Sequence, residues 1–114
     1  MKAVKGSSIK IESVVYLHDQ VIANISGADI TVMVKKNVND PDSAALITKT
    51  VGSGVTIVDG GNGRFDTVIT AAETNTLSVS KVHIEALVNL TTGEYIRSGI
   101  ENIELEPNLI KVLN

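Results

Sequence analysis

The sequence contains no cysteine and no tryptophan, and only one phenylalanine and two tyrosines occur among its 114 residues. Without cysteine the chain forms no disulfide framework, no thiolate metal cage and no thiol nucleophile. With so few aromatic side chains it also lacks the stacking surfaces on which proteins bind nucleic-acid bases and sugar rings. We therefore expect no cofactor and no small-molecule substrate.

Charge and long apolar runs are equally scarce. The formal net charge is −3, and the longest basic run is Lys35–Lys36. This balance does not favour a nucleic-acid partner. Lys2 and Lys5 are not followed by the apolar region of a secretory signal, and no apolar run approaches the length of a membrane span. The sequence predicts neither secretion nor membrane insertion.

The abundant residues are β-branched. The chain has 15 valines, 13 isoleucines and 10 threonines, which together make a third of its residues. Such side chains are stiff at χ1 and pack well on a pleated surface, so they favour strands. The length suits one domain with a core of its own. We expect an all-β protein.

Alternation of apolar and polar residues places seven strands along the chain. In the strand at 28–35, for example, Ala28, Ile30, Val32 and Val34 face the core, while Lys35 faces the solvent. In the first strand the inward set runs from Ile9 to Leu17. The seven expected strands span residues 8–17, 28–35, 44–51, 55–58, 63–70, 79–89 and 95–105.

The stretch 54–70 reads as a β-hairpin around a glycine-rich reversal, because glycine reaches the positive φ angles of tight turns. We expect this stretch to be scaffold, with Phe65 as a core anchor. One helical turn is predicted within 71–77, with Leu77 packing inward. A change of apolar parity in the last strand predicts a β-bulge near Ser98–Gly99.

Strands of this number and spacing predict an immunoglobulin-like, seven-stranded Greek-key β-sandwich. We expect a single domain over residues 1–114, with its core in 8–106 and an apolar tail at 107–114. No Cys–Trp–Cys pattern of antibody domains is present.

Candidate metal ligands are weakly supported. Asp59, Asn62 and Asp66 surround the glycine-rich loop 59–66 and have the oxygen atoms that calcium prefers. Turn chemistry explains the same residues without an ion, because Asp59 can cap its own backbone. His18 and His83 fall in different elements and are interpreted as surface residues. We expect no metal site from either histidine.

Catalytic patterns are also weak. Ser53 lies between two glycines, but no serine occupies a Gly-x-Ser-x-Gly elbow. Glu104 and Glu106 share one strand face and are interpreted as a charged sheet edge that resists aggregation. We therefore expect a protein that is not an enzyme.

Three stretches carry a resemblance to a known family: Ile25–Val32, Gly54–Asp59 and Asn62–Phe65. Together with the crossover that ends at Leu77, they resemble the N-terminal immunoglobulin-like domain of bacteriophage baseplate upper proteins and related phage tail modules. The similarity covers roughly positions 8–106. Baseplate upper proteins continue into helices and a second domain, so the resemblance implies either a free-standing module or a fragment.

The resemblance implies a structural role in a phage or prophage virion, in the tail, baseplate or connector, without catalysis. The implied partners are further copies of the chain and other virion proteins, after synthesis in the bacterial cytoplasm. An alternative from another class is a bacterial surface or secreted binding module for carbohydrate or protein. The low aromatic content argues against that alternative.

Apolar residues expected outside the core are the candidate interface. If the strand registers hold, Val14, Tyr16, Val68 and Leu87 lie on outer faces, and a contiguous patch of them would mark a subunit contact. The tail either packs on its own domain or adds a strand to a neighbour's sheet. The interface residues predicted from the sequence are Tyr16, Leu87, Leu109, Ile110, Val112 and Leu113.

Overall fold

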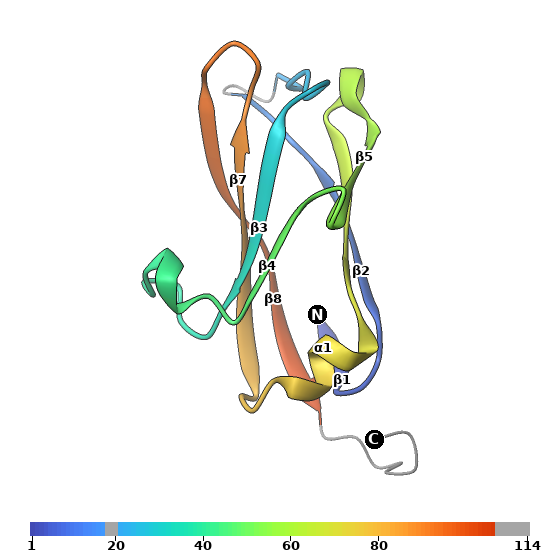
Figure 1. The fold of residues 1–114 in the computed structure, drawn as a ribbon, viewed down its shortest axis with the longest axis vertical. Coiled ribbons are helices and arrows are strands. Elements are labelled where there is room, and N and C mark those ends of the chain that lie inside the picture. The colour runs from blue at the N-terminus through green and yellow to red at the C-terminus, as the bar shows by residue number, and fades with distance from the viewer. Residues whose placement is uncertain (18–20, 107–114) are drawn as a thin grey trace.

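The computed structural model describes residues 1–17 and 21–106, and these form an all-β fold with one short helix. Figure 1 shows the strands as two facing layers that curve toward each other. The strands are β1 (Lys2–Val4), β2 (Ile9–Val14), β3 (Asp29–Lys35), β4 (Ile47–Val51), β5 (Gly54–Asp59), β6 (Arg64–Ile69), β7 (Lys81–Asn89) and β8 (Tyr95–Glu106). The helical segments are the 3₁₀ turns η1 (Asp42–Ala44) and η2 (Gly60–Asn62) and the α-helix α1 (Ala71–Thr76).

The strands follow one another in a single mixed sheet in the order β1-β8-β7-β3-β4-β5-β6-β2. Most neighbours are antiparallel, whereas β1 with β8 and β4 with β5 are parallel. The contact between β4 and β5 covers only two residue pairs, at the corner made by Gly52 and Ser53. The sheet bends there and curls into a nearly closed barrel around the core.

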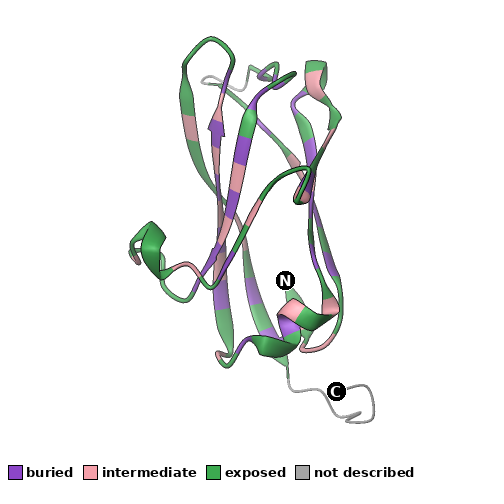
Figure 2. Ribbon diagram, in the orientation of Figure 1, coloured by how far each residue is buried: buried purple, intermediate pink, exposed green. Residues whose placement is uncertain are grey.

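The core follows the predicted alternation. Ile30, Val32 and Val34 of β3 are buried, as is every second residue of β7 from Val82 to Val88. Figure 2 shows the buried positions as purple bands along these two strands. Phe65 is 1% exposed and Leu77 is buried, so both core predictions are confirmed. The predicted helical turn between the fifth and sixth expected strands is α1.

Helix α1 is fixed by a capping box. The hydroxyl of Thr70 accepts a hydrogen bond from the Glu73 amide, and the Glu73 carboxylate accepts one from the Thr70 amide. Thr74 is fully buried and its hydroxyl donates to the Ser7 carbonyl at 2.8 Å. The helix thereby holds the turn between β1 and β2.

Two details of the predicted fold need correction. The described residues form eight strands and not seven, because β1 pairs in parallel with β8 at Glu104–Glu106. Glu104 and Glu106 are exposed, but they do not lie on a free sheet edge, since β1 covers it. The predicted bulge is present: Ile84 pairs with Glu101 and Glu85 with Gly99, which leaves Ile100 as the extra residue.

The glycine-rich hairpin of β5 and β6 has the predicted form and a second use. Gly63 has φ +67°, in the left-handed region. A Cβ at Gly63 would lie 2.8 Å from the Val15 carbonyl oxygen and 2.9 Å from that of Ala23, and one at Gly60 would lie 2.9 Å from the Ser26 Cα. The glycines therefore let the connection between β2 and β3 pack directly on the hairpin.

In the described residues no helix is long and apolar enough to cross a membrane.

Candidate functional site: a cleft between β2 and β8

The barrel is incomplete where strand β8 faces strand β2, which is at the far end of the strand order. Strand β8 pairs with β7 from Tyr95 to Glu104, but on its other side β1 pairs only with Glu104–Glu106. Strand β2 pairs with β6 and, among the described strands, with no other. The segment Tyr95–Glu101 of β8 and the outer edge of β2 therefore face each other without a ladder between them.

An apolar hollow of about 250 Å³ fills this gap, and we call it the β2–β8 cleft. Its floor reaches the core at Phe65, Ala86 and Val88, which are all buried. Its remaining lining residues are Ser13, Val14, Val15, Tyr16, Leu17, Ile96, Arg97, Ser98 and Ile100.

The β8 side of the cleft includes core-facing positions that the described residues leave partly uncovered. Ile96 pairs with Val88 and Ser98 with Ala86, so both lie on the inner face of the sheet. Yet Ile96 and Ile100 are only half-buried and Ser98 is exposed, while Ile103 and Leu105 farther along β8 are buried. This half of the strand appears green and pink in Figure 2. Within residues 1–17 and 21–106 no strand covers the inner face here.

The β2 side forms the rim. The exposed fractions are 41% for Val14, 48% for Tyr16 and 36% for Leu17. The prediction that Leu17 faces the core is therefore wrong. Strand β2 ends at Val14, and the chain turns away from the core before Leu17. Tyr16 then forms an isolated bridge with Ile22, and the Val15 amide donates to the Gly63 carbonyl at 2.8 Å. The rim is thus held by the glycine hairpin.

The predicted interface residues separate in the structure. Tyr16 lines the cleft. Leu87 is half-buried on the outer face of β7, where it pairs with Thr31 and Arg97, and so it belongs to a different surface. Tyr16 and Leu87 thus lie on different surfaces, and the interface role of each stays a prediction. Leu109, Ile110, Val112 and Leu113 lie outside the described residues.

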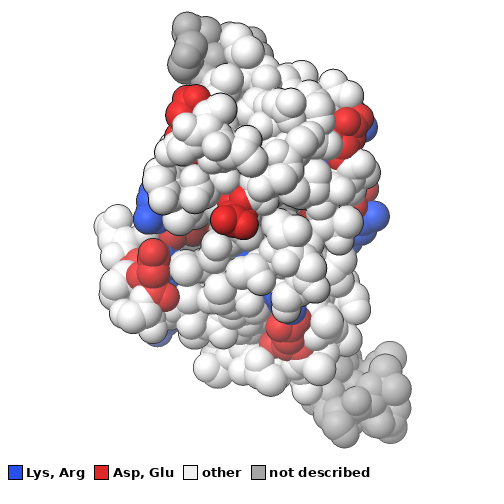
Figure 3. All heavy atoms as spheres, turned by 45° about the horizontal axis from the view of Figure 1, so that its top comes forward, with Lys and Arg blue, Asp and Glu red and all other residues white. Residues whose placement is uncertain are grey.

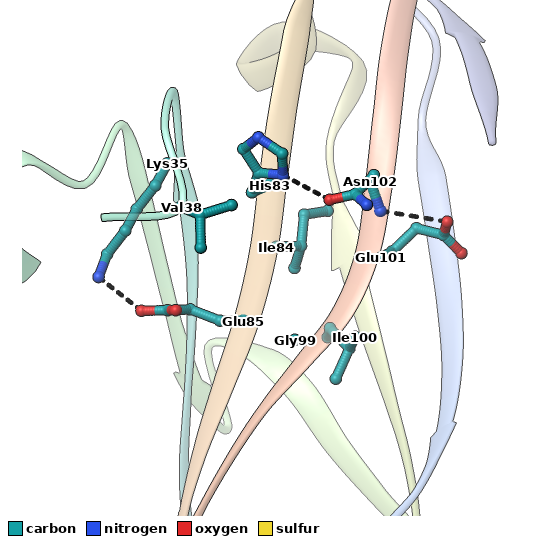
Figure 4. A pocket seen from close by; sticks show the side chains of 9 residues that line it. All are labelled: Lys35, Val38, His83, Ile84, Glu85, Gly99, Ile100, Glu101 and Asn102. Carbon is teal, nitrogen blue, oxygen red and sulfur yellow. Dashed lines mark hydrogen bonds and ion pairs between the residues drawn. The ribbon is translucent and has the colours of Figure 1, made fainter. Parts of the chain in front are cut away.

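A second hollow, of about 340 Å³, lies on the outer face of β3, β7 and β8 (Figure 4). Lys35 lies at its side and is 3% exposed, which contradicts the outward position predicted for it. The Lys35 ammonium donates to Asp42 at 2.8 Å and to Glu85. Turn η1 folds back over this end of β3 and supplies Asp42, an arrangement that strand alternation does not reveal.

Ion pairing sets the protonation of this cluster. The hydrogen bond from Lys35 holds the pKa of Asp42 below its ordinary value, and the bonds to Asp42 and Glu85 raise the pKa of Lys35. The ammonium is already engaged by two carboxylates. On the neighbouring strands, His83 Nδ1 lies within hydrogen-bond distance of Asn102 Oδ1 (Figure 4). We assign this cluster a role in fixing η1 to the sheet.

The loop considered for calcium uses its oxygen atoms in other contacts. The side-chain amide of Asn62 donates from Nδ2 to Asp59 Oδ2 at 2.8 Å, and the Asp66 carboxylate pairs with Lys10 at 3.4 Å. Within residues 1–17 and 21–106 no group of three or more His, Cys, Asp or Glu side chains could hold a metal ion. His18 lies outside the described residues, and His83 is half-buried.

Charge is dispersed over the face drawn in Figure 3. Acidic and basic side chains appear there as separate small groups among neutral residues. No extended area of one sign is visible on that face. In the β2–β8 cleft itself Arg97 is the one charged residue among the described lining residues, so apolar contact is the main force that the cleft offers to a partner.

Comparison with known protein families and with curated proteins finds no match to this chain.

Proposed function

We propose that the protein is a non-catalytic structural module that assembles with further copies of itself and with other proteins of a phage or prophage virion. The observation that carries this proposal is the β2–β8 cleft: an apolar hollow beside a strand edge that has no partner among the described residues. Exposed strand edges readily accept another chain, and an apolar rim adds burial energy to that contact.

We also infer an immunoglobulin-like fold, as expected for the phage tail modules that the sequence resembles. Its support is the narrow β4–β5 contact, which divides the sheet into the layers β1-β8-β7-β3-β4 and β5-β6-β2. The chain passes between the layers from β2 to β3 and, through α1, from β6 to β7. Crossings of this kind are typical of Greek-key sandwiches. In this proposal the protein is made in the bacterial cytoplasm and resides in the virion.

Sedimentation velocity over a wide range of concentrations tests the assembly proposal. We expect the protein to sediment as an oligomer, or as a species whose mass rises with concentration. A strict monomer at the highest concentration would contradict self-assembly. The genes beside the coding sequence give an independent check on the virion: portal, terminase or tail genes are expected there, and a metabolic operon would argue against a virion role.

A further inference from the structure

We infer that the β2–β8 cleft binds residues 107–114 of a second copy of the chain, as a strand added beside Tyr95–Glu101 of β8. This inference deepens the proposed function, on which it rests, because it names the partner and the contact. Strand addition supplies main-chain hydrogen bonds along the edge and places alternate side chains into pockets.

The cleft has the shape of a place for one more strand. Its β8 edge spans seven residues, from Tyr95 to Glu101, and the inward side chains of Ile96 and Ile100 remain half-exposed. Its volume is about 250 Å³, and its floor reaches Phe65. An apolar cavity of about 150 Å³ is enough to hold a benzene ring, so two aliphatic side chains fit in this space.

The pattern of residues 107–114 fits that place. Residues 108–114 number seven, the same as the open segment of β8, and read Asn-Leu-Ile-Lys-Val-Leu-Asn. In a strand, alternate residues face opposite sides. If Leu109 and Leu113 faced the cleft, Lys111 between them would do so too, and its charge would be buried without a partner. Ile110 and Val112 therefore face the cleft.

The length of the segment argues for a second copy as its source. It follows Glu106, where Val4 of β1 is paired, and β1 occupies the same edge of β8 back to Glu104. From Glu106 to Ile96 the strand spans ten residues, or about 33 Å at a rise of about 3.3 Å per residue. Eight extended residues cover about 26 Å, so this segment of the same chain does not reach Ile96.

The experiment compares four full-length variants by sedimentation velocity. Ser98→Trp fills the cleft from an exposed inward position, and Thr56→Trp places the same side chain on the exposed face of β5 as its control. Ile110→Ser/Val112→Ser removes the inserted side chains, and Lys111→Ser is its control. Circular dichroism melting verifies that every variant is folded.

We expect self-association to be lost in Ser98→Trp and in the Ile110→Ser/Val112→Ser variant, and kept in both controls. A mixture of the two defective variants should associate again, because one supplies an intact cleft and the other an intact strand. Association that survives in both defective variants would overturn the cleft contact and leave the assembly function standing. A wild-type protein that is monomeric throughout would overturn both, and a mixture that stays monomeric would overturn strand exchange.

Discussion

Two buried threonines show how differently the same side chain is used in this core. Thr74 is fully buried, and its hydroxyl accepts from the Gly6 amide at 3.1 Å and donates toward the Ser7 carbonyl. Thr67 is equally buried on the inner face of β6, and its hydroxyl has no hydrogen-bond partner in the part of the chain that the structure describes. A buried polar group without a hydrogen-bond partner destabilises the folded state, whereas a hydrogen-bonded one stabilises it.

Replacement of each threonine by valine should therefore give opposite results. Thr74→Val should lower the free energy of unfolding by about 1–3 kcal/mol, because Gly6 and Ser7 lose their partner. Thr67→Val should leave the free energy of unfolding unchanged or raise it by up to about 1 kcal/mol, because a methyl group of similar volume replaces a desolvated hydroxyl. Urea denaturation measures both. Equal destabilisation by the two variants would show that side-chain shape, and not hydrogen bonding, decides the outcome.

Lys35 marks the limit of what residue alternation can predict. The pattern of β3 correctly places Ile30, Val32 and Val34 inside, because their partners on β7 are also apolar. Lys35 is buried for a different reason: η1 folds back and brings Asp42 to its ammonium. That contact depends on the path of a loop, which the alternation of apolar and polar residues does not indicate.

At the scale of elements, the β5–β6 hairpin joins two parts of the chain. Its backbone accepts hydrogen bonds from the connection between β2 and β3: the Gly63 carbonyl from Val15 and the Gly60 carbonyl from Ile25, both at 2.8 Å. The absence of side chains at Gly60 and Gly63 permits this approach. The hairpin thus holds the rim of the β2–β8 cleft as well as its own turn.

Gly63→Ala should be more damaging than the same change at Gly93, although both glycines have positive φ angles, +67° and +93°. At Gly93 the new Cβ meets open space, so we expect only the backbone cost of about 1–2 kcal/mol. At Gly63 the new Cβ also meets two backbone oxygens within 3 Å, so the loss of unfolding free energy should be larger than at Gly93. Thermal melting followed by circular dichroism compares them. Similar losses would mean that backbone conformation alone matters.

Regular elements were predictable in proportion to their length and alternation. The long strands β7 and β8, the hairpin and the bulge near Gly99 follow from local patterns. Strand β1 was missed because three residues carry no alternation, and its partner, Glu104–Glu106, is about a hundred residues away in the sequence. The β2–β8 cleft could not be predicted for the same reason, since it depends on which strands become neighbours.

At the scale of the whole molecule, two ion clusters tie separate elements to the sheet. Lys35 connects β3 with η1 and β7, and Lys49 connects β4 with Glu73 of α1. The pKa of Glu73 is lowered, first by the hydrogen bond from Lys49 and then by the Thr70 capping contacts. The Lys35–Asp42 and Lys49–Glu73 pairs join elements that share no strand ladder, whereas Lys35 and Glu85 lie on the paired strands β3 and β7. Titration of Asp42 and Glu73 therefore acts on the assembled fold.

Stability should consequently show a plateau bounded by these groups. The pKa values of Asp42 and Glu73 are lowered from 3.8 and 4.5, so their contribution is complete above those values and is lost as the pH falls below them. The pKa of Lys35 is raised from 10.5, so its contribution persists up to that pH and is lost above it. Melting temperature measured against pH tests this shape. In the double variant Asp42→Asn/Glu73→Gln the fall of melting temperature at low pH should become shallower. The exposed control Glu106→Gln should leave that fall unchanged. A fall as steep in the double variant as in the wild type would assign acid sensitivity to other carboxylates.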